Sequence, residues 1–544
     1  MDYKQNSRRN FMKQIIGSGV IASSPLNMFL LQMMNQMIST GVAHAAGETD
    51  VFSDYKFINF FMFGGVPRWY WDLPLQPNGS GDAFTQNKMG ITGFVNGVPK
   101  YLSTEKPVGK FYLPYIWDSD IPTPSGSVPM RDLAEHFMTI RGVNLQIDSH
   151  FIDAVKQLSP IPGVSLIGTI ADNAATPVPA AGNAGAIGFI SNKGRNFTNI
   201  SGNSPLSDAL NPFIVPANKQ LLSQRSQTIE AGIDRVLNAM KGSSSEYHKY
   251  LPVTFEDRLN AKNLMKKKFD GLQDQYVSLV VKYESLISRA MTETEFNNQP
   301  FLNNLDLKGS QIPEFSLNGE YYTGLDISRA VAPGVSSLAA SMTIAEYMVK
   351  NGYSSCINNT IGESAINLAP TGVNSFRSTG YDPHGVGSYI SLFANSARFK
   401  AMAACFQELI TQLKSVPVKN GTLFDRTIMT LTSDFNRNGR ADGSGSDHGW
   451  QGSNYTVFSG MITEPTVLGN IKSDSSDQYK GTWGTAAGVD GNLGRDTIMG
   501  NVMSTICTMM DIPSITPNDS SFVMKSSGGK ITAKANFAPR NKDE

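Results

Sequence analysis

Residues 426–450, RTIMTLTSDFNRNGRADGSGSDHGW, are the stretch that decides the fold. The opening run, 426–432, is apolar and rich in β-branched side chains, which is typical of a short buried strand. Asp434 comes directly after it, and a polar, glycine-rich loop then leads to Asp447 and His448. We therefore expect Asp434 to emerge at the carboxyl end of a central strand.

Other apolar runs and helical patterns alternate along the chain. The predicted strands are 56–63, 137–143, 354–360 and 455–458, and the predicted helices are 150–158, 334–350 and 388–413. This alternation predicts an α/β sandwich with a mostly parallel central sheet between helices. Residues 223–300 carry apolar side chains at steps of three and four, which indicates a helical insertion. In such folds, active groups gather beyond the carboxyl ends of the strands.

The first 45 residues predict a cleavable export signal of the twin-arginine type. Arg8 and Arg9 precede an apolar run, and Ala43-His44-Ala45 offers a cleavage pattern of small residues. Polar and glycine residues interrupt the apolar run, so no stable transmembrane anchor is expected. An uncleaved signal that acts as an anchor is the alternative. We therefore expect the twin-arginine export machinery as a partner and a periplasmic or extracellular location.

The remaining chain predicts a single domain over residues 46–525 and a polar C-terminal tail over 526–544. The chain has 46 basic and 46 acidic residues, so its net charge is zero. A nucleic-acid partner normally requires a basic surface, and none is therefore expected.

Acidic and histidine side chains are paired at two places. Asp382 and His384 lie two residues apart, so an extended backbone would point both to one side. Asp434 at the strand end and His448 after the loop complete the set, with Asp447 in reserve. Nitrogen and oxygen ligands of this kind suit Zn²⁺ or Mn²⁺, and Ca²⁺ less well. Each pair alone, Asp382 with His384 or Asp447 with His448, is more typical of a turn or a hydrogen-bonded pair. The two pairs together with the strand-end Asp434 make a metal site as good an interpretation.

Two further groups are candidates for catalysis. Ser149 opens a predicted helix, where its hydroxyl is either a nucleophile activated by a metal or an ordinary N-cap. His150 would orient Ser149, bind a metal, or simply pack in the fold. Arg437, just after the strand end, would bind an oxyanion through its planar guanidinium group, or it is a solvated loop charge.

Four motifs resemble those of an exported bacterial family known as domain of unknown function fifteen-oh-one. They are Ser149-His150-Phe151, Tyr381-Asp382-Pro383-His384, Ser433-Asp434-Phe435-Asn436-Arg437 and Ser446-Asp447-His448-Gly449. That family is placed within the alkaline phosphatase and sulfatase superfamily and commonly carries twin-arginine signals. The order and approximate spacing of the motifs are similar from about residue 55 to residue 515.

The resemblance implies an alkaline phosphatase-like sandwich with a mononuclear or binuclear metal site. Asp382 and His384 would bind one ion, and Asp434 and His448 the same ion or a second one. Ser149 would take the place of the superfamily's nucleophile. We therefore expect an exported metal-dependent hydrolase of phosphate or sulfate esters, with a small-molecule or glycan ester as substrate. The alternative is a catalytically degenerate exported or cell-surface binding protein on the same fold.

Overall fold

The computed structural model describes residues 54–62, 64–76, 87–95, 98–101, 104–162, 164–174, 179–181, 275, 277–291, 313–317, 319–321, 335–352, 354–360, 383–483, 485–486 and 495–539. The predicted signal, Asp382 and most of the predicted insertion at 223–300 lie outside these residues. Within that insertion, residues 277–291 are helical, as the pattern predicts.

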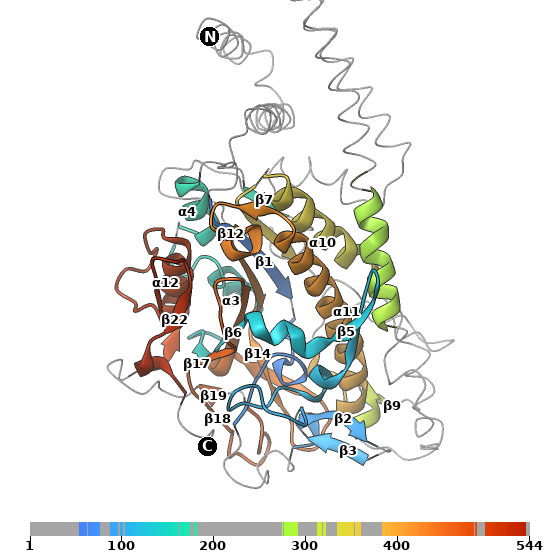
Figure 1. Cartoon of the computed structure of the whole chain (residues 1–544). Helices are drawn as coiled ribbons and strands as arrows, with labels where there is room; N and C mark the ends of the chain where they lie inside the picture. Colours follow the sequence, from blue (N-terminus) through green and yellow to red (C-terminus); the bar gives the residue numbers. More distant parts are fainter. Residues whose placement is uncertain are drawn as a thin grey trace, which may run out of the picture.

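A sheet of eight strands lies at the centre of the described chain, with helices on both of its faces (Figure 1). Its strands in spatial order are β17 (Thr466–Leu468), β6 (Phe137–Asn144), β16 (Ser453–Ser459), β13 (Thr427–Ser433), β1 (Lys56–Met62), β10 (Cys356–Thr360) and β7 (Pro179–Ala181), with β20 (Thr497–Ile498) also paired to β6. Strand β16 is antiparallel to both neighbours, and the other pairings are parallel. A mixed α/β architecture with a mostly parallel central sheet is therefore confirmed.

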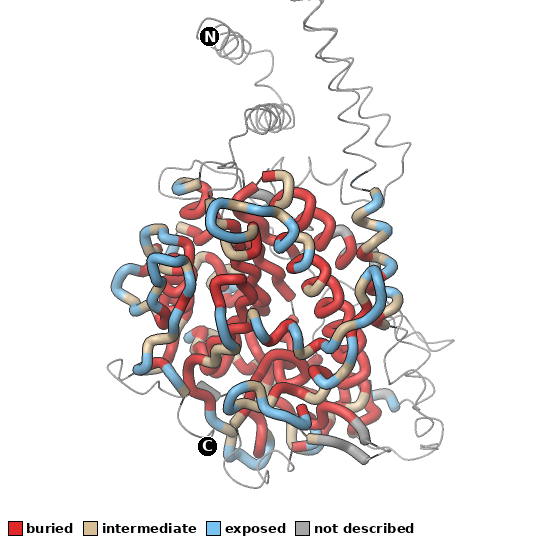
Figure 2. Tube along the Cα trace, in the orientation of Figure 1, coloured by how far each residue is buried: buried red, intermediate tan, exposed pale blue. Residues whose placement is uncertain are grey.

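Strand β1 shows why the sheet is covered on both faces. Side chains of Ile58, Phe60 and Met62 belong to one apolar core, whereas Phe57 and Phe61 belong to the other. Successive side chains of a strand point to opposite faces, so a continuous apolar run needs a cover on each side. Figure 2 shows the result, with buried residues along the central strands and exposed ones on the outer loops.

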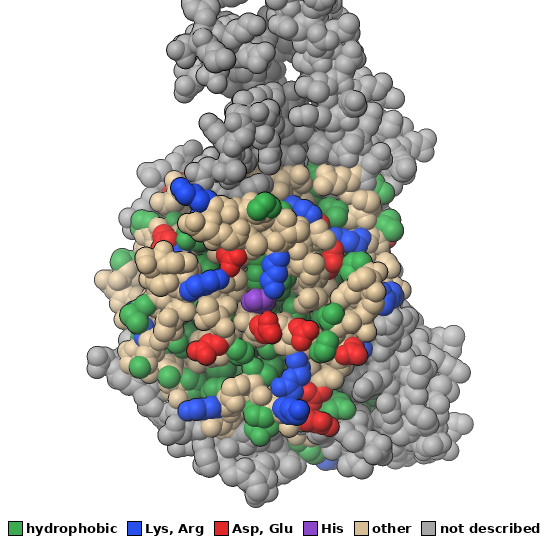
Figure 3. Space-filling model, viewed as in Figure 1, with side chains coloured by type: hydrophobic (Ala, Val, Ile, Leu, Met, Phe, Trp, Pro, Cys, Tyr) green, Lys and Arg blue, Asp and Glu red, His purple; other side chains and the backbone are tan. Residues whose placement is uncertain are grey.

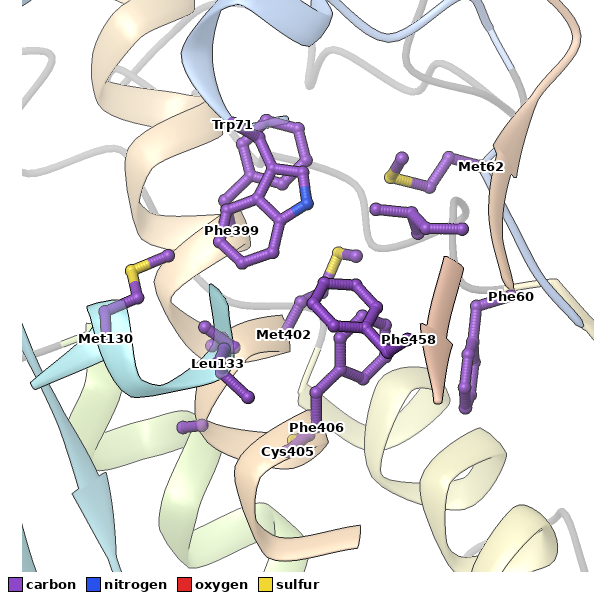
Figure 4. Close-up of a cluster of buried hydrophobic side chains, with 14 of the residues drawn as sticks. Phe60, Met62, Trp71, Met130, Leu133, Phe399, Met402, Cys405, Phe406 and Phe458 are labelled. Atoms are coloured by element: carbon purple, nitrogen blue, oxygen red, sulfur yellow. The ribbon is translucent and has the colours of Figure 1, made fainter. Parts of the chain in front are cut away.

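Two groups of helices supply these covers. Helices α10 (Val335–Lys350) and α11 (Ser388–Lys414) contribute to the first core, and α3 (His150–Lys156), α4 (Leu166–Asn173) and α12 (Met499–Met510) contribute to the second. On α11, the ring centroid of Phe406 lies 5.0 Å from that of Phe60 and 5.5 Å from that of Phe458 (Figure 4). The aromatic side chains of this helix therefore pack directly on the strands.

The predicted strands and helices named above are present, with ends that differ by no more than two residues. Part of the predicted polar C-terminal tail, 526–544, has regular structure. Residues 523–525 and 531–533 pair as the hairpin β21 (Val523–Lys525) and β22 (Ile531–Ala533). Phe537 is buried against Phe522, with ring centroids 4.2 Å apart, because scattered apolar residues anchor an otherwise polar segment.

Charged side chains of both signs are interspersed on the face that Figure 3 shows, without a broad area of one sign. In the described part of the chain, no helix is long and apolar enough to cross a membrane. The absence of a nucleic-acid partner stays a prediction.

Lys56 is an exception among the buried residues of β1, because its side chain is fully buried and ionisable. Its ammonium group donates to the hydroxyl of Ser355 at 3.4 Å. Burial lowers the pKa of Lys56 from 10.5 to about 8, although the nearby Asp54 acts in the opposite direction. The folded state therefore releases this proton at a lower pH than the unfolded state does.

Substitution Lys56→Met should stabilise the protein at pH 7. Below pH 8 the buried charge destabilises the folded state, by up to about 3 kcal/mol for a pKa that falls by some 2.5 units. That cost disappears as the pH rises from about 8 to 10.5, so the stability advantage of the variant should shrink over this range. Urea unfolding at pH 7 and pH 10 measures the difference. The same substitution at the exposed Lys472 is the control, and an equal pH dependence there would contradict the assignment.

Candidate metal centre

Strands β1 and β13 end together, and the site is built where they end. Met62 is paired with Ser433, so the glycines after β1 lie beside Asp434. The backbone N–H groups of Gly64 and Gly65 donate to the two carboxylate oxygens of Asp434 at 3.1 and 2.6 Å. Gly65 has a φ of +67°, and a Cβ there would lie 2.5 Å from the Phe435 ring. Glycine is therefore required at this close approach.

Asp434 is fully buried and also receives a hydrogen bond from the hydroxyl of Ser433 at 3.0 Å. Asp434 also contacts His150, the first residue of α3. Nδ1 of His150 lies 2.5 Å from a carboxylate oxygen of Asp434. Strand β6 runs parallel to β13, with the reversed strand β16 between them, so the loop after β6 reaches the same edge. The fold thus joins the Asp434 carboxylate to a histidine 284 residues away in sequence.

A hairpin places His448 at the same edge. Strands β14 (Asn436–Gly439) and β15 (Ser446–Gly449) are antiparallel, with Arg437 opposite His448. Nδ1 of His448 contacts a carboxylate oxygen of Asp148, and Nε2 lies 2.8 Å from Nε2 of His384. The glycine-rich loop predicted from sequence is therefore the turn that returns the chain to the site.

His384 completes the group. It lies in a single 3-10 turn just before α11, and its Nδ1 is 3.1 Å from a carboxylate oxygen of Asp447. One ring nitrogen from each of His150, His384 and His448 lies within 4.8 Å of the other two. Nitrogens bound to a tetrahedral Zn²⁺ at about 2.0 Å are about 3.3 Å apart, so this group could hold a metal ion.

The three imidazoles are held by aromatic packing and remain open to solvent. The Phe435 ring lies 4.5 Å from that of His150 and 4.3 Å from that of His448, measured between centroids. The side chains of His150, His384 and His448 keep 25%, 40% and 20% of their surface exposed. Solvent and a metal ion therefore have access to this group.

The electrostatics around His384 and His448 favour this role. Although burial alone would raise the pKa of Asp447, Arg440 and Tyr479 hold it at about 2 through hydrogen bonds of 2.7 and 2.8 Å. Burial lowers the pKa of His448, against the opposing effect of Asp148. Asp447 is therefore an anion at neutral pH, and His448 favours the neutral form that binds metals.

The structure brings together most of the predicted site residues. His150, His384, Asp434, Asp447 and His448 lie in one connected group, and Asp382 lies outside the described residues. Sequence reasoning assigned no role to Asp148. Asp148 precedes His150 by two residues, and Asp382 precedes His384 by the same spacing. This repeated spacing is a sequence signal that points to Asp148.

The remaining predicted residues take structural contacts. The hydroxyl of Ser149 caps α3 by accepting from the N–H of Ile152 at 3.4 Å, which is the second of the roles left open for it. Arg437 is fully buried, and it donates to the carbonyl oxygens of Gly64 and Gly65. Its guanidinium group therefore ties the turn after β1 to the sheet edge, and it is not the solvated loop charge that sequence allowed.

Two buried carboxylates lie near this edge. The carboxylate of Asp72 accepts from Arg68 at 2.6 Å, and both side chains are buried. In α3, burial raises the pKa of Asp153 to about 7, and the carboxylates of Asp434 and Asp148 add to this. Among the described residues, the group that could hold a metal includes neither of them.

Comparisons with protein-family models, with curated proteins and with solved structures found no match to this chain.

Single substitutions His150→Ala, His384→Ala and His448→Ala should each remove most of the bound divalent metal. Each takes away one of three nitrogen ligands, and the affinity depends on all three. Elemental analysis of the purified protein, after dialysis against Zn²⁺, measures the metal content per chain. The control is His136→Ala, since His136 contacts Lys414 and Phe424 outside this group. Equal metal content in all four variants would contradict the site.

Proposed function

We propose that the chain is an exported, metal-dependent hydrolase of phosphate or sulfate esters, with a divalent ion held by His150, His384 and His448. The observation that supports this most is the convergence of three ring nitrogens within 4.8 Å at the carboxyl edge of the sheet. Three imidazoles with a remaining open position are typical of catalytic zinc sites. This ligand set favours Zn²⁺ over Mn²⁺, and Ca²⁺ is the poorest fit.

A divalent ion bound there would polarise an ester oxygen and offset its negative charge. The residues of the chain do the rest. Arg440 donates to both carboxylate oxygens of Asp447 and offsets the charge of that carboxylate, which reduces its repulsion of an anionic ester. Phe435 holds two of the imidazole rings in place from one side.

Ser149 is the proposed nucleophile. It directly precedes His150 and caps the start of α3, the helix that carries this histidine. Its capping hydrogen bond from Ile152 is long, at 3.4 Å, which leaves the oxygen weakly engaged. A hydroxyl in this position would lose its proton to water as its oxygen bonds to the phosphorus or sulfur of the ester. The bond from that atom to the ester oxygen would break, the alcohol or phenol would leave with a proton, and water would later hydrolyse the phosphorylated or sulfated serine.

Metal-loaded protein should hydrolyse a generic aryl phosphate or aryl sulfate, and Ser149→Ala should lower that rate by about a thousandfold or more. The variant should keep its metal content, because Ser149 is not among the three nitrogen ligands. Release of the coloured phenol measures the rate, and His136→Ala is the control for general damage. Hydrolysis of neither ester by the metal-loaded protein would rule out this function.

A second candidate is a catalytically inactive binding protein on the same fold. The observation that favours it is the position of Arg437, whose Nε donates to the Gly65 carbonyl at 2.8 Å and does not face an open anion site. Binding of a glycan or another partner would then survive His384→Ala. Binding that depends on the metal would favour the hydrolase.

We also propose that export uses the twin-arginine machinery, on the basis of Arg8 and Arg9. Replacing both with lysine should leave the precursor in the cytoplasm, because that pathway requires the arginine pair whereas a general secretory signal requires only positive charge. Cell fractionation measures the distribution of the protein. The single change Lys4→Gln is the control, and unaltered export of the double-lysine variant would contradict the twin-arginine route.

A further inference from the structure

We propose that Asp148, Asp434 and Asp447 are positioning residues, each holding the outer ring nitrogen of one metal-binding histidine, and that none of the three carboxylates is itself a metal ligand. This proposal deepens the proposed function and rests on its metal site. It differs from the ligand set expected from the sequence, in which Asp434 binds the ion directly.

The pairing is one to one and uses the same atom each time. Nδ1 of His150 lies 2.5 Å from Asp434, and Nδ1 of His384 lies 3.1 Å from Asp447. Nδ1 of His448 makes the third such contact, to Asp148. In each pair the aspartate and the histidine are at least 63 residues apart in sequence, so none of the three contacts follows from local sequence spacing.

An ionised carboxylate can only accept hydrogen bonds, so each Nδ1 must carry the hydrogen. In a neutral imidazole, the lone pair is then on Nε2. For His384 and His448, these two nitrogens face each other at 2.8 Å. When both rings are neutral, two lone pairs face each other there, and a cation between them would accept both. The carboxylates therefore set the tautomer that presents nitrogen lone pairs to an ion.

Two of the carboxylates are already saturated with donors. Asp434 accepts from the N–H groups of Gly64 and Gly65 in addition to His150. Asp447 accepts from Arg440 at both of its oxygens, at 2.7 and 3.0 Å. A carboxylate used in this way is fixed in orientation, and it would have to give up these bonds to bind a metal. Both are therefore suited to orient a histidine.

Asp148 is the least constrained of the three. Its side chain is 55% exposed, and among the described residues its hydrogen bond is to His448. Water competes with the His448 ring for hydrogen bonds to this exposed carboxylate, so Asp148 orients His448 less strongly. The three positions therefore predict an order of effect, with Asp434 the largest and Asp148 the smallest.

The test uses Co²⁺ as the probe, since its visible spectrum reports the ligands around the ion. In Asp148→Ala and Asp447→Ala, we expect Co²⁺ binding to weaken by about 10- to 100-fold with the band positions of the parent protein. Asp447→Asn should recover most of the affinity, because its amide oxygen still accepts from Nδ1. His448→Ala, recorded at a Co²⁺ concentration high enough to load its weakened site, should shift the spectrum. Asp434→Asn avoids an empty buried site, and it should keep the parent spectrum too.

A spectrum in any aspartate variant that shifts as it does in His448→Ala would make that carboxylate a ligand and overturn the proposal. Unchanged Co²⁺ affinity in all the aspartate variants would overturn it as well. Absence of ester hydrolysis with the expected Co²⁺ results would defeat the hydrolase function alone. If the parent chain binds no Co²⁺, both the metal site and this proposal fall.

Discussion

The structure of the site depends on the buried carboxylate of Asp434, which accepts hydrogen bonds from two glycine N–H groups. This interaction joins the carboxyl ends of β1 and β13, which are neighbours in the sheet. The same carboxylate contacts Nδ1 of His150, the first residue of α3, and so fixes the position of this ring. Because a buried carboxylate without partners would be strongly destabilising, the turn after β1 and the start of α3 must form around it.

Much of the fold could be predicted because its strands are covered on both faces. Runs such as KFINFFM and TIMTLTS are rich in apolar and β-branched side chains and are buried along their whole length, which distinguishes them from the irregular segments between them. The direction of β16 could not be predicted, since apolar content says nothing about orientation. The C-terminal hairpin was missed because Ile531 and Phe537 are isolated apolar residues in a polar context.

The sequence predicted most of the residues that form the candidate site, but it predicted only some of their roles. Sequence spacing identified His384, Asp434 and His448 as members of one group, which the fold brings together. The distinction between a carboxylate that binds an ion and one that holds a histidine depends on distances near 3 Å, and spacing cannot report these. Arg437 illustrates the same limit, because its partners are carbonyl oxygens some 370 residues away.

The single reversed strand has a thermodynamic consequence for the whole chain. Strand β16 begins at the edge where β6 ends, with Ser453 paired to Val143, so the segment just before β16 brings His448 to Asp148, 300 residues away in sequence. An ion at this junction would close a long loop without a covalent bond, in a chain whose three cysteines are free and buried. Its binding energy would add to the stability of the folded state by mass action. The stability of the folded chain would thus depend on the concentration of the free metal ion.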